Sequence, residues 1–255
     1  MLSPVIQPML DAYSPVSLED IDSLRFMDRV DTKFVFPAGQ LPLLIGSLQG
    51  IYRVLEIGGL RAFLYNTRYM DTADFLFFRQ HVTGRLARHK IRCRRYESTG
   101  GAFLEVKMKT NKNRTKKWRI ENDFSNDCSD EKSLQFISKH IPYSLNGLQP
   151  VLINKFIRIT LAGTETCERI TFDYDLSFST MNGESADLPF IAIAELKSEG
   201  FYSQSPFLLS ARRIGVRPTC FSKYCIGNAL LRDLPRKNVL KPQLLLLNKI
   251  ENGYS

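Results

Sequence analysis

The chain has 255 residues, of which 44% are hydrophobic, so it is long enough for one well-filled core with small helical additions. No window approaches 18 consecutive apolar residues, so no membrane-spanning helix is expected. The first residues lack a basic stretch followed by an apolar one, so no secretory signal is expected either. The five cysteines are an odd number without a CxxC pair. This pattern argues against disulfides and a zinc site, and it favours the cytoplasm.

The net charge of +9 is concentrated in one segment. Residues 85–119 contain 13 lysines and arginines but only two acids, Glu97 and Glu105, which gives this segment a net charge of +11. The remaining 220 residues therefore sum to about −2. A run of charge is often a solvated surface, so its arrangement along the predicted strands decides what it means.

The first third of the chain is predicted to mix short helices and strands. Ser17 is a typical helix N-cap, followed by acids in the first turn, and predicts a helix through Phe26. Alternating apolar and charged residues predict a strand over residues 29–36, ended by Pro37. The patterns further predict a helix over residues 38–49, a hairpin of residues 52–57 and 63–71 around Gly58 and Gly59, and a helix over residues 72–83 closed by Gly84.

Strands dominate the rest of the chain. They are predicted over residues 89–97, 103–109, 116–124, 151–161, 168–175 and 190–197, with turns at Gly100-Gly101 and Asn182-Gly183. Helices are predicted over residues 131–141, 204–214 and 222–232, and a tail containing Pro235 and Pro242 follows. Eight or nine strands with few long helices indicate an antiparallel barrel or a strongly curved sheet.

Alternation along these strands separates charged residues from apolar ones. Successive side chains of a strand point to opposite faces. The charged faces are predicted to carry Lys90, Arg92 and Arg94; Glu105, Lys107 and Lys109; Lys117, Arg119, Glu121 and Asp123; Arg169, Thr171 and Asp173; and Glu195 with Lys197. Each strand alone is compatible with a half-exposed sheet whose charges face solvent. Five such strands together favour a closed arrangement in which the charged faces meet each other.

A cationic interior of this kind needs a polyanion. Two like charges 4 Å apart repel by about 4 kcal/mol at an intermediate dielectric. Phosphate is the natural partner, because arginine forks match its oxygens and lysine supplies point charges. The interleaved acids Asp31, Glu105, Asp173 and Glu195 would weaken the binding of bare phosphate. They are compatible either with ligands for Mg²⁺ or Mn²⁺ or with salt-bridge partners that hold the lysines extended.

An ordered set of motifs resembles a known family. The sequence is similar to the polyphosphate polymerase domain of the vacuolar transporter chaperone (VTC) complex and its bacterial relatives, in the triphosphate tunnel metalloenzyme (CYTH-like) superfamily. The motifs that carry the resemblance contain Arg29, Asp31 and Lys33; Tyr69 and Asp71; Phe77 and Arg79; Lys90, Arg92, Arg94 and Tyr96; Phe103, Glu105 and Lys107; Lys109 to Lys117; Phe156 and Arg158; Arg169 and Asp173; Glu195 and Lys197; and Phe221, Lys223 and Tyr224.

The resemblance implies an α+β fold, an antiparallel eight-stranded β-barrel tunnel with helices packed outside. It implies a tunnel domain over residues 25–232, with an N-terminal extension (1–24) and a C-terminal tail (233–255). The implied reaction transfers the γ-phosphoryl group of ATP to a polyphosphate chain with Mn²⁺ or Mg²⁺ as cofactor. The partners are ATP and polyphosphate, without nucleic acid, and a membrane-protein partner is compatible with this activity.

The resemblance, together with the charged faces, also assigns roles to individual residues. The catalytic phosphate-binding set is Lys33, Arg92, Arg94, Arg158 and Lys223. Further substrate-binding residues are Lys90, Lys107, Lys109, Lys117, Arg119, Arg169 and Lys197. The metal ligands are Glu195 and Asp31.

Three positions depart from the superfamily's usual pattern. Hydrolases of the superfamily open with a Glu-x-Glu-x-Lys strand, whereas this chain has Arg29, Asp31 and Lys33. The arginine removes one metal-binding carboxylate and resembles the polymerase branch. Asp31 is one methylene shorter than glutamate, and Phe156 lacks the hydroxyl of the tyrosine that is common at this position.

Three other functions remain open from the sequence. The first is a metal-dependent triphosphatase or nucleotide phosphohydrolase in the same tunnel. The second is a nucleic-acid-binding or other polyanion-binding protein, as the basic segment suggests. Against it, Phe103, Trp118 and Phe124 are expected to occupy or border the apolar faces, which leaves no aromatic residue at a stacking position on the basic strands. The third is a non-catalytic phosphate sensor.

Overall fold

The computed structural model describes residues 3–23, 29–111, 114–124, 130–142, 147–199 and 204–253. Its main element is a large sheet with the strand order β2-β11-β9-β8-β4-β5-β6-β7, and all neighbours in this order pair antiparallel. The strands are β2 (Arg29–Pro37), β4 (Ala62–Asp71), β5 (Arg88–Tyr96), β6 (Ala102–Lys109), β7 (Thr115–Glu121), β8 (Gln149–Gly163), β9 (Glu168–Ser179) and β11 (Ile191–Glu199). Shorter strands β1 (Pro15–Val16), β3 (Tyr52–Leu55) and β10 (Ser185–Leu188) join at the side.

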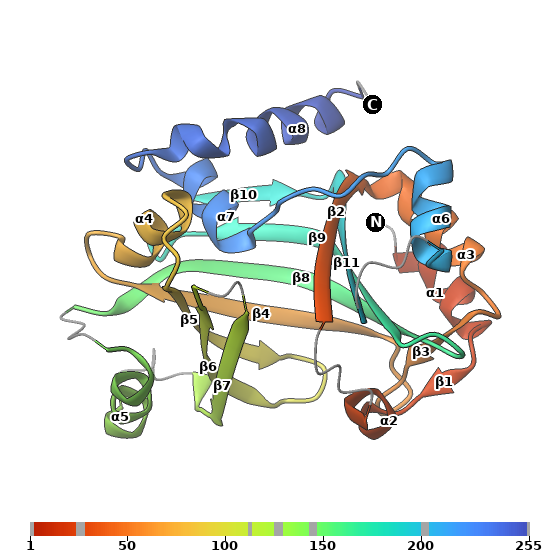
Figure 1. The fold of residues 1–255 in the computed structure, drawn as a ribbon, viewed down its shortest axis with the longest axis horizontal. Coiled ribbons are helices and arrows are strands. Elements are labelled where there is room, and N and C mark those ends of the chain that lie inside the picture. Colours follow the sequence, from red (N-terminus) through yellow and green to blue (C-terminus); the bar gives the residue numbers. More distant parts are fainter. Residues whose placement is uncertain are drawn as a thin grey trace.

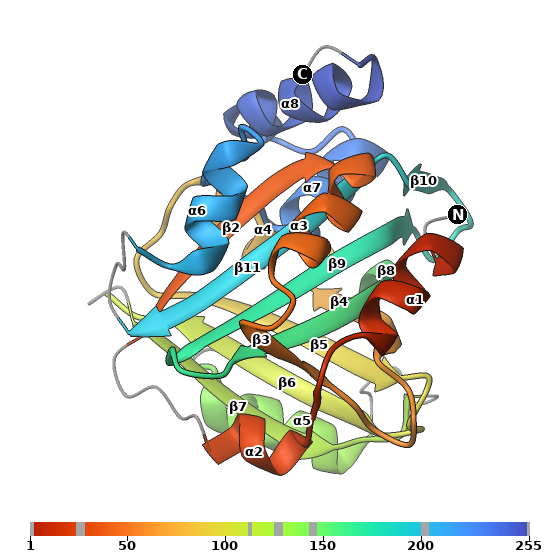
Figure 2. The same cartoon turned by 90° about the vertical axis from the view of Figure 1, so that its right-hand side faces the viewer.

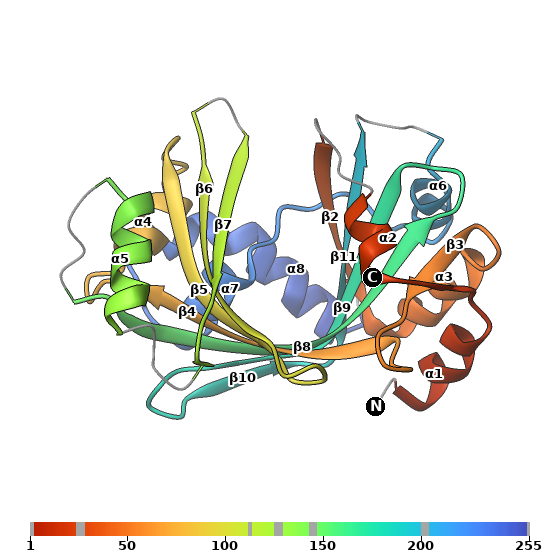
Figure 3. The same cartoon turned by 90° about the horizontal axis from the view of Figure 1, so that it is seen from below.

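The sheet is strongly curved, and Figure 3 shows it nearly end-on. Strands β2, β11 and β9 form one wall, β5, β6 and β7 form the other, and β8 and β4 connect them. The two edge strands, β2 and β7, are not paired with each other in the described part of the chain. The α+β class, the antiparallel pairing and the eight-strand path agree with the prediction, but closure into a hydrogen-bonded barrel is not confirmed.

Helices pack around the outside and at one end of the curved sheet (Figures 1 and 2). They are α1 (Ser3–Asp11), α2 (Leu18–Ser23), η1 (Ala38–Gln40), α3 (Leu41–Ser47), α4 (Leu76–Val82), α5 (Glu131–His140), α6 (Pro206–Arg213), α7 (Lys223–Leu231), η3 (Lys237–Leu240) and α8 (Lys241–Glu251). Within the described ranges, no helix is long and apolar enough to cross a membrane. The tail beyond residue 232 forms η3 and α8.

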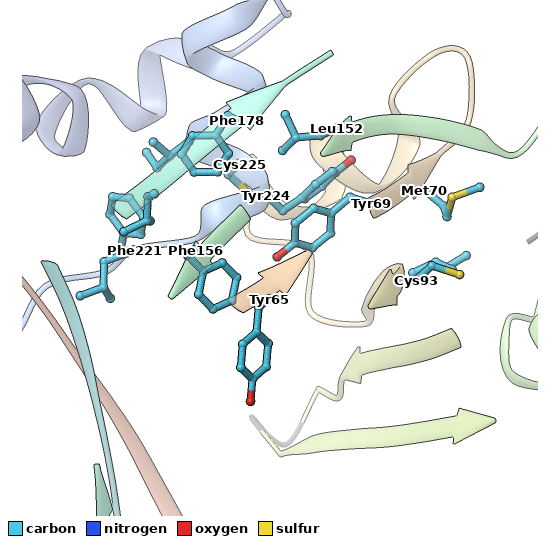
Figure 4. Close-up of a cluster of buried hydrophobic side chains, with 14 of the residues drawn as sticks. Tyr65, Tyr69, Met70, Cys93, Leu152, Phe156, Phe178, Phe221, Tyr224 and Cys225 are labelled. Atoms are coloured by element: carbon cyan, nitrogen blue, oxygen red, sulfur yellow. The ribbon is translucent and has the colours of Figure 1, made fainter. Parts of the chain in front are cut away.

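Two apolar cores hold these layers together. The first lies between the convex face of β2, β9 and β11 and helices α1, α3 and α6, and it includes Phe34, Phe172 and Phe207. The second lies where α4 and α7 meet β4 and β8, and Figure 4 shows part of it, including Phe178 and Tyr224. Because the alternate residues of the same strands face these cores, the charged residues are left on the concave face.

The predicted hairpin around Gly58 and Gly59 is wrong. Strands β3 and β4 do not pair with each other beyond an isolated bridge between Ile57 and Leu60. Both pair with β8 in the same antiparallel sense: Val54 is opposite Leu161, and Ala62 is opposite Ile159. The two glycines have positive φ angles and form a tight loop that interrupts one long strand.

Two further departures concern a strand and a cysteine. The turn at Asn182 and Gly183 was predicted, but strand β10, which follows it and pairs with β9, was not. Cys93 is disulfide-bonded, contrary to the expectation from cysteine spacing, whereas Cys167, Cys220 and Cys225 are free. Spacing failed here because a disulfide depends on which residues the fold brings together, and that information is absent from local sequence.

Close packing at Gly227 of α7 leads to a stability prediction. A Cβ atom at this position would lie 2.5 Å from Phe178 and 2.8 Å from Leu152. We therefore expect Gly227→Ala to lower the free energy of unfolding by about 1–3 kcal/mol, the usual cost of overpacking. Chemical denaturation checks this. Gly39→Ala is the control, because a Cβ there meets nothing within 4 Å. An unchanged stability of Gly227→Ala would contradict the packing of α7 on β8 and β9.

Candidate functional site

The concave face carries the predicted charged residues, and the register brings those of β5, β6 and β7 into rows. Arg92 is directly opposite Glu105, and Glu105 is opposite Arg119. In the next row, three lysines stand side by side, since Lys90 is opposite Lys107 and Lys107 is opposite Lys117. Like charges in adjacent pairs destabilise a sheet, so this row calls for a compensating anion.

The opposite wall continues the pattern. Lys33 of β2 is opposite Glu195 of β11, and Asp31 is opposite Lys197, which in turn faces Arg169 of β9. The charges of the two walls act on one another across the concave face. Glu195 and Lys197 influence the pKa of Lys107, and Lys33 influences those of Lys90 and Lys109. The structure therefore brings charged residues of both walls to one concave face, among them Lys33, Lys107 and Glu195.

Glu105 is the most buried carboxylate of the site, with no exposed surface. It accepts from Arg92 at 2.5 Å and is also ion-paired with Lys117. Burial raises its pKa, but the charges of Arg92, Arg94 and Lys117 outweigh burial and hold the pKa far below its usual range. Glu105 is therefore an ionised anchor that keeps two cations in place.

Asp173 plays the same part on β9. Its two oxygens accept from Arg158 at 2.6 and 2.7 Å, and Lys223 forms a second ion pair with it. Burial raises the pKa of Asp173, but Arg158 and Lys223 outweigh this and lower it to about 2. Burial lowers the pKa of Lys223 to about 8, with Asp173 opposing the shift.

Lys223 reaches the site from the first turn of α7, which is held by buried polar contacts. Ser222 caps the helix by accepting from the Cys225 backbone N–H, and its hydroxyl also accepts from Lys90 at 3.1 Å. The next residue, Tyr224, donates its hydroxyl to Asp71. That carboxylate also accepts from the backbone N–H groups of Thr72 and, in the first turn of α4, of Phe77 and Phe78, at 2.8–3.0 Å. The Tyr224–Asp71 pair thus connects α7 to β4 and α4.

Glu195 lies between two lysines, with Lys33 at 2.9 Å and Lys197 at 3.0 Å. Burial raises its pKa, but the charges of Lys197 and Lys33 hold the pKa well below its usual range. Asp31, on the neighbouring strand, acts on the same two lysines. Among the described residues, no group of three or more acids, histidines or cysteines could enclose a metal. This donor set fits Mg²⁺ or Mn²⁺ held by one or two carboxylates together with phosphate oxygens.

Arg94 and Lys107 are cations of the site that have no carboxylate of their own among the described residues. Arg94 is only 6% exposed and donates to the hydroxyl of Thr67 at 3.1 Å. The charge of Arg92, together with burial, lowers the pKa of Lys107 well below its usual value. These two side chains add positive charge that no carboxylate of the described residues balances.

An aromatic floor lies under the cations, and sequence reasoning missed it. The rings of Tyr65 and Phe156 stack with centroids 5.2 Å apart. Arg94 and Arg158 each lie 5.0–5.8 Å from both ring centroids, and Lys223 lies 4.2 Å from that of Phe156. Such contacts favour cations over aromatic faces. The position of Phe156, two residues before Arg158 on the same strand, places it on the same face.

The face of the sheet on which Phe103 lies differs from the prediction. Phe103 was expected to occupy or border the apolar faces, but it lies on the charged face, opposite Arg94 and next to Tyr96. The guanidinium of Arg119 lies 5.0 Å from its ring centroid. Simple alternation from Glu105 and Lys107 would have found this placement. Trp118, by contrast, stacks with His140 of α5 on the other face.

These features define an α+β protein whose curved sheet presents a surplus of cations, most of them partly buried, on its concave face. The sequence matches the family model of the VTC domain over residues 28–232, which is most of the chain. The protein belongs to the VTC domain family, and the resemblance drawn from the motifs is confirmed.

Similar solved structures include three that share 14–15% identity with this chain. A candidate adenylate cyclase from Vibrio parahaemolyticus aligns over 79% of this chain and 99% of its own, with a TM-score of 0.47 and 14% identity. A candidate adenylyl cyclase from Hippeastrum, whose title reports a dominant triphosphatase activity, aligns over 83% and 99%, with a TM-score of 0.47 and 14% identity. A candidate adenylate cyclase from Bacillus halodurans aligns over 76% and 94%, with a TM-score of 0.48 and 15% identity. No curated protein matches the sequence.

The uncompensated charge of Lys107 gives a testable prediction. Lys107→Met removes a cation that its neighbours repel, so we expect the ligand-free protein to unfold a few degrees higher, about 1 kcal/mol of added stability. The same variant should lose most of the thermal stabilisation that tripolyphosphate gives the parent. Lys116→Met is the control, since Lys116 is exposed and lies opposite Met108 on the other face. Equal stabilisation of Lys107→Met and the parent would place phosphate elsewhere.

The pKa of Lys223 predicts a pH dependence of binding. Since this pKa is about 8 in the folded protein, below the ordinary value of 10.5, the empty site gives up this proton before the unfolded chain does. The contribution of Lys223 to stability therefore rises between about pH 8 and pH 10.5, where the folded protein has lost this proton and the unfolded chain still holds it. Over the same range the affinity for phosphate falls. We expect tripolyphosphate affinity, measured by calorimetry, to decline above pH 8, and Lys223→Arg to reduce the decline because arginine stays charged. Identical pH profiles would exclude Lys223 from phosphate binding.

Proposed function

We propose that this protein is a metal-dependent polyphosphate polymerase that transfers the γ-phosphoryl group of ATP to a growing polyphosphate chain on the concave face. Membership of the VTC domain family supports a phosphoryl-transfer role, and the site supplies the charge that such a role needs. With ATP as the donor, the location that we propose for this reaction is the cytoplasm.

The observation that carries this proposal is that the buried Arg94 and the half-buried Lys107 have no carboxylate partner among the described residues. A buried charge is costly unless it is paired. Glu105, Asp173 and the half-buried Glu195 already serve six other cations: Arg92, Lys117, Arg158, Lys223, Lys33 and Lys197. The remaining positive charge is suited to a ligand with several negative charges in a row, which is the character of a linear phosphate chain.

The proposed roles of the residues follow from their contacts. Arg92, Arg94 and Arg158, with their planar donor groups, would bind and orient phosphate oxygens, and Lys33, Lys107 and Lys223 would neutralise charge around them. Flanking lysines and arginines would extend the track for the chain: Lys90, Lys109, Lys117, Arg119, Arg169 and Lys197. Phosphoryl transfer is catalysed mainly by positioning and charge stabilisation, so the side chains need not include a covalent nucleophile.

Glu195, with Asp31, would hold the divalent metal together with phosphate oxygens. When bound, the metal would neutralise negative charge that develops on the transferring group. The two lysines that now contact Glu195 would then be free to turn toward phosphate. Because Asp31 is exposed and short, we assign the larger share of metal binding to Glu195.

The decisive experiment incubates purified protein with ATP and Mn²⁺ and separates the products by size. A polymerase yields long-chain polyphosphate and ADP, whereas a triphosphatase yields only orthophosphate or short products. Lys107→Met should abolish the product, and Lys116→Met should retain it. Orthophosphate without polymer would replace the polymerase with the hydrolase. Phosphate binding without turnover would indicate a sensor.

The metal assignment is tested by Glu195→Gln. We expect this variant to lose about 100-fold or more in metal-dependent turnover, as is typical for loss of a catalytic charge partner. It should keep its thermal stability within a few degrees, because Lys33 and Lys197 are only part-buried. A titration of turnover against Mn²⁺ provides the measurement. Near-parental turnover at saturating Mn²⁺ would show that the metal binds without Glu195.

A further inference from the structure

A row of aromatic rings crosses the concave face from β8 to β6. It begins with the stacked pair of Phe156 and Tyr65 and continues to Tyr96, whose ring centroid is 4.9 Å from that of Tyr65. Phe103 follows at 5.9 Å from Tyr96, and the guanidinium of Arg119 lies 5.0 Å beyond. The four residues come from β8, β4, β5 and β6, adjacent strands of the sheet.

The two ends of this row differ in burial and in what they support. Phe156 is 1% exposed and Tyr65 is 9% exposed, and both lie beneath the phosphate-binding cations. Phe103 is only half-buried and belongs to neither apolar core. Its ring contacts Tyr96 and the guanidinium of Arg119, next to the most charged part of the molecule.

The charges around Phe103 change sign across the sheet. On one side Arg94 lies directly opposite it, and on the other side Glu121 of β7 does. Glu121 is exposed, and in the described ranges it forms no ion pair. A carboxylate there repels a further phosphate group, so this end of the row suits an uncharged part of the ligand.

The face of Phe103 already accommodates a planar group, the guanidinium of Arg119. Arg119 is exposed and can move away from the ring. Nucleobases stack on both aromatic rings and guanidinium planes. Phe103 on β6 also lies directly opposite Arg94 on the neighbouring strand β5, and Arg94 is one of the proposed phosphate-binding residues.

From this arrangement, we propose that Phe103, with Tyr96 and Arg119, forms a stacking site for the base of a nucleoside triphosphate whose phosphates occupy the adjacent cations. This inference rests on the proposed phosphate site and goes beyond it, because it assigns a separate subsite to the nucleoside. The base lies against the ring of Phe103, between it and a displaced Arg119. The triphosphate runs from there toward Arg94 and Arg158.

The test compares the binding of three ligands by calorimetry without turnover: ATP, ribose 5′-triphosphate and inorganic tripolyphosphate. ATP and ribose 5′-triphosphate carry the same esterified triphosphate and differ only in the base. We expect ATP to bind about tenfold more tightly than ribose 5′-triphosphate, the order expected for stacking one base. Phe103→Leu should reduce this ratio to near one while leaving the affinity for tripolyphosphate within about twofold.

Two further variants make the result independent of folding defects. Phe103→Trp offers a larger stacking surface and should increase the ratio, a gain that misfolding cannot produce. Phe75→Leu is the control, because it also removes a ring covered by an arginine, Arg232 at 5.4 Å, but on the turn before α4. It should leave the ratio unchanged.

The outcomes separate the two proposals. If ATP and ribose 5′-triphosphate bind the parent equally, the base site is wrong and the phosphate site stands. If Phe103→Leu weakens all three ligands alike, Phe103 acts on the phosphates and the base site is again overturned. If none of the three ligands binds the parent, the proposed phosphate function fails.

Discussion

The site depends on one recurring interaction, a carboxylate that holds two cations. Glu105 does this on β6, Asp173 on β9 and Glu195 on β11. Each cluster keeps a net positive charge, because one acid cannot neutralise two bases. Two like charges 4 Å apart repel by about 4 kcal/mol at an effective dielectric of about 20. The acids make this crowding tolerable in the empty protein and leave the excess charge for a ligand.

The apolar layers make such an arrangement possible. Phe34 and Phe172 alternate along their strands with Lys33 and Asp173, so the same strands serve the core on one face and the charges on the other. Curvature then turns the charged faces of the two walls toward each other. The Tyr224–Asp71 contact adds α7, and with it Lys223, to the same site. Core packing and charge placement are thus two consequences of one alternating pattern.

The local sequence predicts which face of a strand each side chain occupies, because this follows from alternation. It does not predict which strands pair with each other. The faces of Arg92, Lys107 and Glu195 follow from a period of two, and the structure agrees. The loop at Gly58 could not be recognised, because β3 and β4 share the distant strand β8 as partner. The disulfide at Cys93 and the lack of β2–β7 pairing in the described part of the chain likewise depend on contacts far apart in sequence. The face that Phe103 occupies, by contrast, does follow from alternation with Glu105 and Lys107.

A binding site that recognises only phosphate groups could not distinguish the donor of a polymerase from its product. ATP and polyphosphate present the same oxygens to Arg94, Arg158 and Lys107, so the product would compete with the donor at every cation. Charge cannot separate the two ligands, since both are linear polyanions. An uncharged contact can, and the ring of Phe103 is the half-buried aromatic surface beside Arg94. A base stacked there would fix which end of the row receives the nucleotide and leave the rest of the cationic face to the growing chain.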